Sequence, residues 1–190
     1  MPFRQDQAVY LRQRIGAYDE MSKSTAGIDT EHFHIHQGRA FSMVHLAEVA
    51  PETSYLVQIN TGDKYVHLRH RNYSVERGEW ILTIWEDATG LTPGPVEVPV
   101  FNKNRNSQEE SSVEIFGGST GLNGGTIINQ IYMNAGEQQL SSGTEMNCGE
   151  EEWILKPNST YVVEWERLEG FGMDSATIAT RWFWYEVEAN

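Results

Sequence analysis

The stretch Thr177-Ile178-Ala179-Thr180-Arg181-Trp182-Phe183-Trp184-Tyr185-Glu186-Val187 decides the predicted fold class. β-Branched and aromatic residues, which favour strands, make up most of it. Successive side chains of a strand point to opposite faces, so this strand carries bulky rings on both. Burying both faces requires a central strand that is covered on each side, or contact with a partner subunit. We therefore name a candidate self-association strand, Trp182, Phe183, Trp184 and Tyr185; the alternative is a central strand with half-exposed outer rings.

Similar β-rich runs recur from about residue 31 onward, and turn residues such as Gly, Pro and Asn separate most of them. The runs are 32–36, 40–49, 54–60, 64–70, 79–86, 96–102, 112–116, 126–133, 160–168 and 177–187. No convincing helical pattern lies between them. About ten short strands in this arrangement predict an all-β fold, an antiparallel sandwich or barrel, because βαβ units would need helices between the strands.

The first 30 residues differ from the rest in charge and in pattern. Their four basic side chains equal their four acidic ones in number, so the remaining residues carry all of the net charge. Leu11, Ile15 and Tyr18 form a weak helical stripe. We predict a partly helical N-terminal arm over residues 1–30 and a β-sandwich domain over 31–190. The alternative for the arm is a frayed terminus without a role.

Composition excludes several classes of protein. The chain has 190 residues with 27 acidic and 14 basic side chains, a formal net charge of −13, which argues against nucleic acid as the main partner. No stretch approaches the roughly 18 apolar residues of a membrane span, and the first residues lack the apolar core of a signal peptide. Its one cysteine, Cys148, allows no intrachain disulfide. We expect a soluble protein that folds inside a cell.

Three histidines alternate with two apolar residues in His32-Phe33-His34-Ile35-His36. We predict a strand that presents His32, His34 and His36 on one face. Cupin-like barrels bind a metal with two histidines of one strand that are separated by one residue. They also need a nearby carboxylate and another histidine on a facing strand. No acidic residue follows before Glu48, and His45 or His67 would have to be brought close by the fold. A histidine face toward solvent or a subunit neighbour is favoured, so no metal or cofactor is predicted.

No pattern supports catalysis, and the chain is predicted not to be an enzyme. Cys148 lies beside Glu150–Glu152, and those carboxylates would raise its thiol pKa. Gly118-Ser119-Thr120-Gly121 lacks the spacing of a nucleophile elbow. Exposed tryptophans would suit a carbohydrate-binding module, which stays open as a rival; the candidates outside the C-terminal run are Trp80, Trp85, Trp153 and Trp165.

Six segments together resemble the head decoration (cement) proteins of tailed bacteriophages. They are Gly38-Arg39-Ala40-Phe41, Lys64-Tyr65-Val66-His67-Leu68, Trp85-Glu86-Asp87-Ala88-Thr89, Asn102-Lys103-Asn104-Arg105-Asn106-Ser107, residues 152–161 (EWILKPNSTY) and Trp184-Tyr185-Glu186. Their order along the chain carries the resemblance, which spans residues 38–186 and leaves the arm uncovered. None of them is a catalytic signature.

The resemblance implies a jelly-roll-like sandwich that assembles into homotrimers, less often dimers, on the outer surface of a phage head. Its partners would be the major capsid protein and further copies of itself, with no cofactor. It would be made in the bacterial host cytoplasm and would clamp neighbouring capsomers against the pressure of packaged DNA. The histidine-rich segment and the arm depart from the family pattern, and we hypothesise that the arm orders on the capsid. The alternatives are a carbohydrate-binding β-sandwich module of a virion and a cupin-like metal protein.

Overall fold

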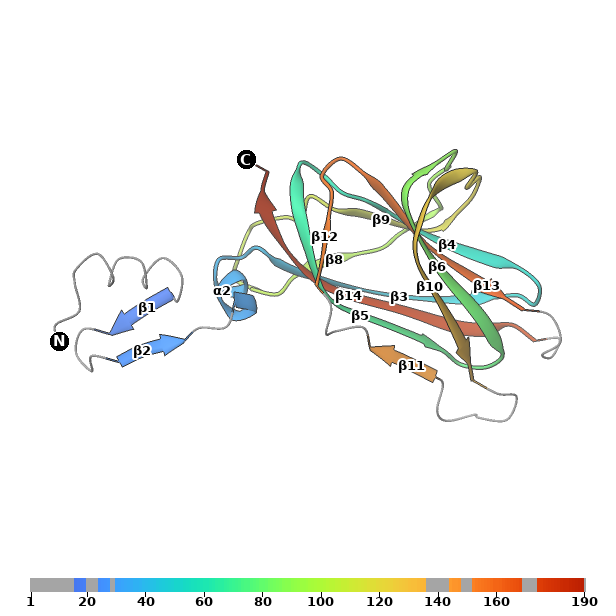
Figure 1. Cartoon of the computed structure of the whole chain (residues 1–190), viewed down its shortest axis with the longest axis horizontal. Helices are drawn as coiled ribbons and strands as arrows, with labels where there is room; N and C mark the ends of the chain where they lie inside the picture. Colours follow the sequence, from blue (N-terminus) through green and yellow to red (C-terminus); the bar gives the residue numbers. More distant parts are fainter. Residues whose placement is uncertain are drawn as a thin grey trace.

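Figure 1 shows the computed structural model, which describes residues 16–19, 24–27, 30–135, 144–147, 152–168 and 174–189. Two antiparallel sheets pack against each other with the apolar core between them. The predicted all-β sandwich is confirmed. No helix in these ranges is long and apolar enough to cross a membrane.

Sheet I has the strand order β11-β5-β14-β3-β8, and β12 also pairs with β5. Its strands are β3 (Ala40–Val49), β5 (Lys64–Val75), β8 (Val100–Asn102), β11 (Thr144–Asn147), β12 (Trp153–Leu155) and β14 (Ala176–Glu188). The centre of this sheet is β14, which pairs with β3 on one side and with β5 on the other.

Sheet II has the strand order β10-β6-β13-β4-β9-β7. Its strands are β4 (Ser54–Asn60), β6 (Glu79–Thr89), β7 (Val96–Glu97), β9 (Glu114–Ser119), β10 (Gly124–Asn134) and β13 (Thr160–Arg167). One edge of this sheet is β10, which pairs with β6.

Eight of these strands have jelly-roll connectivity. They form β3-β14-β5-β11 in sheet I and β4-β13-β6-β10 in sheet II, and the chain passes repeatedly from one sheet to the other. The first of them therefore lies beside the last. Strands β7, β8 and β9 come between β6 and β10 in the sequence and extend both sheets at the opposite edge. The jelly-roll-like arrangement that the resemblance implied is confirmed.

Large aromatic side chains fill the space between the sheets. The Trp165 ring lies edge-on to Trp80 and Tyr73, with centroid distances of 6.2 and 5.9 Å. All three rings are fully buried, as is Trp184. The period-two pattern of the sequence identified most of the strands because each inner face meets the other sheet. The short strands β11 and β12 were not among the predicted runs.

The segment 1–30 contains a two-stranded hairpin of β1 (Gly16–Asp19) and β2 (Ser24–Gly27). Of the expected helical stripe, Leu11 and Ile15 lie outside the described residues, and Tyr18 lies in β1. The helix that the structure describes, α2 (Thr30–His36), begins at the last residue of the expected arm.

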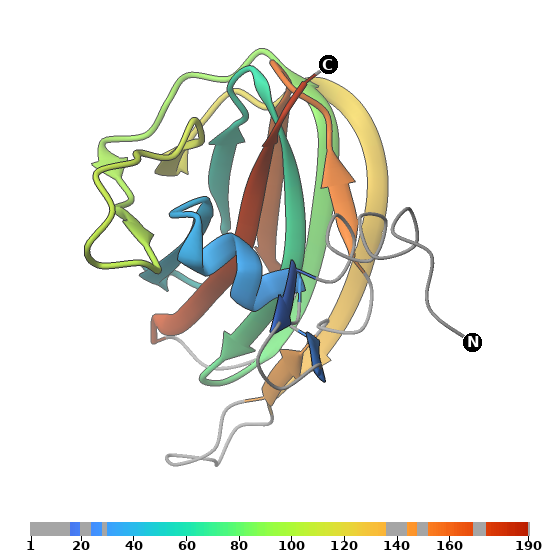
Figure 2. The same cartoon turned by 90° about the vertical axis from the view of Figure 1, so that its left-hand side faces the viewer.

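The prediction of a strand over 32–36 was wrong, because this segment forms α2. The helix ends in a Schellman motif, in which the Arg39 N–H bonds to the His34 carbonyl and the Gly38 N–H to the Ile35 carbonyl, each at 3.0 Å. Gly38 holds the left-handed φ of +71° that this motif needs. Ile35 packs on a cluster formed by Ala40, Phe183 and Tyr185. Figure 2 shows α2 against the outer side of sheet I, where it covers β14.

Replacing Gly38 by alanine is expected to lower the free energy of unfolding by about 1–3 kcal/mol, because the left-handed φ costs about 1–2 kcal/mol and the added Cβ clashes with Ser107. Gly118→Ala is the matched control, since Gly118 has a φ of +77° but its nearest neighbour lies at 3.6 Å. Urea denaturation should show the larger loss for Gly38→Ala. Equal losses would contradict the role of the Ser107 contact.

Candidate interaction surface

The six segments that resemble decoration proteins meet at one end of the sandwich. In sheet I the end of β14 pairs with the starts of β3 and β5, so that Trp184 lies beside both Phe41 and Leu68. Strand β12 adds to the same part of β5, with Trp153 opposite Leu68. In Figure 1, α2, β8, β12 and the end of β14 lie toward the same end of the sandwich, with β8 and β12 on opposite sides of β14. Segments far apart in the sequence therefore meet at this end, which we call the convergent end: 38–41, 64–68, 85–89, 102–107, 152–161 and 184–186.

A buried carboxylate fastens the loop after β8 to the convergent end. Glu186 is almost fully buried and accepts hydrogen bonds from the Ser112 N–H at 3.0 Å, from the Ser111 hydroxyl and from Trp184 Nε1 at 3.1 Å. At the other side of the loop, Asn102 Nδ2 donates to the Gly38 carbonyl at 2.7 Å. The loop is thus held at both of its ends.

A second set of contacts connects β12 to sheet II. Lys156 Nζ donates to Glu86 at 2.7 Å and to Asp87 at 3.1 Å, and the Tyr161 hydroxyl donates to Glu86 at 3.0 Å. The bonds to Glu86 and Asp87 raise the pKa of Lys156, which therefore stays an ammonium ion. Burial, assisted by the Glu86 carboxylate, raises the pKa of Tyr161 to about 12. These hydrogen bonds and ion pairs connect the end of β12 with β6 of sheet II.

The outer side of sheet I carries a cluster of stacked rings under α2. The His34 ring stacks on Tyr185 with a centroid distance of 3.9 Å, and His67 stacks on it at 4.6 Å. Glu152 accepts hydrogen bonds from the Tyr185 hydroxyl at 2.8 Å and from Arg69 at 2.7 Å, and His67 Nδ1 lies 2.9 Å away. Burial acts to raise the pKa of Glu152, but these bonds outweigh it and lower the pKa. The cluster therefore holds a carboxylate at neutral pH.

The candidate self-association strand is buried within a single chain. Trp182 and Trp184 lie in the core between the sheets, whereas Phe183 and Tyr185 lie on the outer side and pack against Ile35 of α2. All four are at most 7% exposed. They were assigned to a subunit contact because both faces of the strand carry large rings that need to be covered. Within the chain, α2 supplies the cover that a partner was expected to provide. They hold the convergent end together.

The histidines named from the sequence do not gather in one place. His32 and His36 lie on the exposed side of α2, and His34 lies on the side that faces Tyr185. His45 is buried elsewhere, with Nε2 at 2.9 Å from the Tyr55 hydroxyl. Within the described ranges no group of three or more His, Cys, Asp or Glu could hold a metal ion. Cys148 lies outside those ranges.

Acidification is expected to destabilise the protein through His34. Burial, followed by the nearby His67 and Arg39, lowers the pKa of His34, so that below about pH 6.5 the unfolded chain takes up a proton more readily than the folded one. Stability is therefore lost as the pH falls from about 7.5 to 5.5. His34→Phe keeps a ring on Tyr185 without a titrating group, so its urea midpoint should fall less over this range. The same fall in both proteins would contradict this assignment.

Sequence reasoning predicted a strand over 126–133 but missed that this strand, β10, is an exposed edge. Residues 115–136 carry no charged side chain, although the chain as a whole has 22% charged residues. Ile127, Ile128 and Tyr132 of β10 are 37–56% exposed, and Ile154 of the neighbouring β12 is 59% exposed. The absence of charge over this stretch was the signal that could have identified it. An uncharged, apolar edge strand is a template for pairing with another chain.

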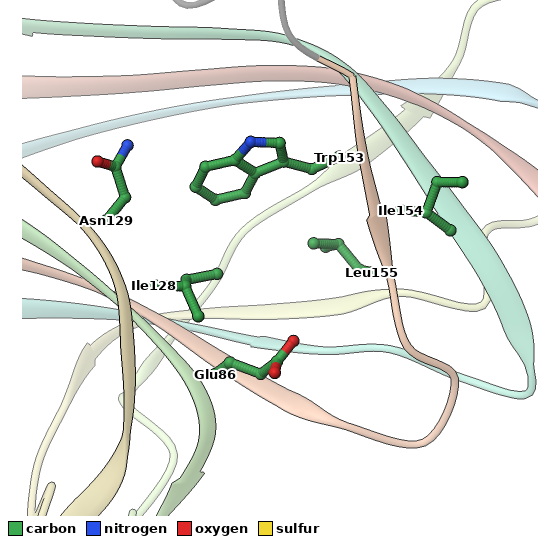
Figure 3. A pocket seen from close by; sticks show the side chains of 6 residues that line it. All are labelled: Glu86, Ile128, Asn129, Trp153, Ile154 and Leu155. Carbon is green, nitrogen blue, oxygen red and sulfur yellow. The ribbon is translucent and has the colours of Figure 1, made fainter.

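Between β10 and β12 lies a pocket of about 450 Å³, shown in Figure 3. Trp153 and Leu155 project into it from β12, whereas Ile154 lies on the other side of that strand. The Arg71 guanidinium lies 3.7 Å from the centre of the Trp153 ring. The pocket is lined by Glu86, Ile128, Asn129, Trp153, Ile154 and Leu155. It connects the β10 edge to the convergent end.

Comparisons of the chain with protein-family models, with curated proteins and with solved structures find no match.

Proposed function

We propose that the chain is a structural virion protein, a capsid decoration protein that binds the outer surface of a phage head and stabilises it. The observation that carries the proposal is the meeting of six separate segments at the convergent end. These segments are the ones that resemble decoration proteins. If they serve one common function, capsid binding, they are expected to lie at one place in the fold. No catalytic role and no cofactor is part of the proposal.

The rigidity of the convergent end suits a mechanical partner. Glu186 fixes the loop after β8, Lys156 ties β12 to sheet II, and Glu152 ties β12 to β14 through Tyr185. A surface that is already ordered loses little conformational entropy when it binds. A pre-ordered surface therefore favours lasting attachment to a capsid lattice. The partner in this proposal is the major capsid protein.

The β10 edge is the self-association surface in this proposal. Its occupant is a second copy of the chain, because neighbouring copies of a protein with net charge −13 repel each other least along an uncharged strip. Pairing also covers the exposed Ile127, Ile128 and Tyr132 and the side of β10 that pairs with no other strand among the described residues. Pairing of two β10 edges uses the same patch on both copies and closes as a two-fold dimer, the less frequent of the two assemblies that the resemblance implies.

Light scattering tests the self-association surface. The wild-type protein is expected to be an oligomer, and Ile128→Lys is expected to lower its solution mass toward that of the monomer, because it places like charges in the contact. Leu46→Lys is the matched control, since Leu46 is 64% exposed on sheet I, away from β10. A monomeric wild type, or equal masses for the three proteins, would contradict the assignment of the β10 edge.

Co-sedimentation tests the capsid partner. Purified protein is mixed with heads of the encoding phage that were prepared without it, and we expect it to pellet with them. Arg105→Glu changes an exposed side chain of the convergent end and should weaken retention, whereas Arg181→Glu, exposed in the middle of sheet I, should not. Failure of the wild type to pellet would overturn the decoration function.

Deletion of residues 1–30 tests the N-terminal arm in the same co-sedimentation assay. Unchanged retention of the shortened protein would remove the proposed role of the arm.

A groove beside Trp85 favours a second candidate function, carbohydrate binding on a virion. The groove has a volume of about 620 Å³, and Trp85 Nε1 donates to Glu164 at 2.8 Å within it. Polar and apolar side chains line the groove together with Trp85: Ser54, Ser119, Thr120 and Asn123, with Leu56 and Leu122. An aromatic platform with polar neighbours is suited to a sugar ring. Saturable binding to an oligosaccharide array that Trp85→Ala abolishes and Trp153→Ala leaves intact would support this function over decoration.

A further inference from the structure

Helix α2 places two exposed imidazoles side by side, one helical turn apart. His32 and His36 lie four residues apart, so that both occupy the same face of the helix. Their Nε2 atoms lie 2.9 Å apart, and the ring centroids 4.6 Å apart. The alternating pattern of the sequence predicted all three histidines, His32, His34 and His36, on one face of a strand. The helix instead turns His34 away, onto Tyr185.

The separation of the two nitrogens matches that of two ligands on one transition-metal ion. With metal–nitrogen bonds of about 2.05 Å, two ligands at 90° lie about 2.9 Å apart and two at the tetrahedral angle about 3.3 Å apart. The observed 2.9 Å agrees with the 90° arrangement of square-planar or octahedral ions. Among the divalent ions that imidazole binds, Cu²⁺ and Ni²⁺ adopt such geometry, and Cu²⁺ binds most tightly.

Contacts on the far side of α2 hold the pair in place. Ile35 packs on Phe183 and Tyr185, His34 stacks on Tyr185, and the Schellman motif at Gly38 fixes the end of the helix. The two histidines are therefore presented on a docked helix and need little reorganisation to bind. Chelation by two ordered ligands exceeds binding by one ligand by about 100-fold or more.

We propose that His32 and His36 form a two-histidine chelate for a divalent transition-metal ion of the Cu²⁺ or Ni²⁺ class. The ion would replace the hydrogen bond between the two Nε2 atoms, and each imidazole would bind it through Nε2 with its ring proton on Nδ1. The nearest carboxylate on the helix, Glu31, faces His70 at 3.3 Å, so the remaining positions of the ion belong to water or to an added ligand. This inference is independent of the proposed function, because it concerns the exposed side of α2 alone.

Calorimetric titration of the full chain with Cu²⁺, with any affinity tag removed, tests the chelate. We expect one ion per chain and a loss of affinity of about 100-fold in both His32→Ala and His36→Ala. His70→Ala is the matched control, an exposed histidine of β5 outside the pair, and should keep the wild-type affinity. Wild-type affinity in either α2 variant, or an equal loss in His70→Ala, would overturn the proposal.

Two further measurements keep the test independent of folding. The glutamine variants His32→Gln and His36→Gln keep a polar side chain on the helix, and their circular dichroism spectra should match that of the wild type. Electron paramagnetic resonance of the wild-type Cu²⁺ adduct should show coupling to two nitrogens. Coupling to one nitrogen or to none would overturn the chelate even if an ion binds.

Discussion

Replacing Trp165 by alanine is expected to lower the free energy of unfolding by about 3–5 kcal/mol, the range for truncating a large core aromatic residue. Trp165 is fully buried between the sheets, where it meets Trp80 and Tyr73 edge-on. Its Nε1 donates to the Thr180 hydroxyl of β14 at 3.2 Å, so the ring joins sheet II to sheet I. The alanine variant loses the packing of both sheets against one side chain.

Equilibrium denaturation in urea measures this loss. Thr180→Val is the control, since it removes the hydrogen bond and keeps the volume, and it should cost only about 1–2 kcal/mol. Trp165→Phe should lie between the two, because a smaller ring fills part of the space. A Trp165→Ala loss no larger than that of Thr180→Val would mean that the hydrogen bond, and not the packing, holds the sheets together at this point.

Glu186→Ala is expected to cost about 2–3 kcal/mol, because it leaves several buried donors without their acceptor. The donors are the Ser112 N–H, the Ser111 hydroxyl and Trp184 Nε1. Glu188→Ala is the matched control on the same strand. Glu188 is 70% exposed and lies 3.5 Å from Lys64, and such a surface pair contributes about 1 kcal/mol at most.

Hydrogen exchange separates a local from a global effect of Glu186→Ala. We expect the Ser112 amide to lose its protection well before the core strands, because Glu186 fastens the loop after β8. Unchanged protection at Ser112, or a loss of stability equal to that of Glu188→Ala, would contradict the role assigned to this carboxylate.

The strands could be predicted from the sequence because each has one face against the other sheet. Alternation holds on each side of a bulge in β5: Val66 and Leu68 point inward before it, and Tyr73 and Val75 after it, because the pairing with β14 skips Arg69. The order of strands within each sheet does not follow from alternation, since any of several jelly-roll or barrel orders satisfies it. The resemblance implied a jelly-roll-like sandwich without giving the order of its strands, which the structure supplies.

The helix over 30–36 could not be predicted from its own residues. Five alternating positions are too few to distinguish a strand from a single helical turn. Gly38 was interpreted as a turn residue, although a glycine after a short run equally marks a helix end. What decides between them is distant in sequence: the outer rings of Phe183 and Tyr185 need a cover, and Ile35 provides it.

The exposure of β10 could not be predicted from its own residues. The uncharged stretch 115–136 is visible in the sequence. Whether it forms a covered central strand or an open edge depends on the position of β10 outside β6, which is a property of the whole topology. The pocket beside Trp153 likewise joins β10 to a strand that follows it much later in the chain.

The pairing of β3 with β14 also means that β3 must wait, during synthesis, for a partner strand near the other end of the sequence. On a ribosome that adds about 5–20 residues per second, β3 emerges on the order of 10 s before its neighbour exists. During that interval its backbone donors and acceptors on that side are open, and so are the apolar faces that β14 will bury. A nascent chain at high expression can then accept β14 from another molecule, which produces domain-swapped dimers instead of closed sandwiches. A lower expression level, or a chaperone that shields β3, should therefore raise the yield of correctly closed protein.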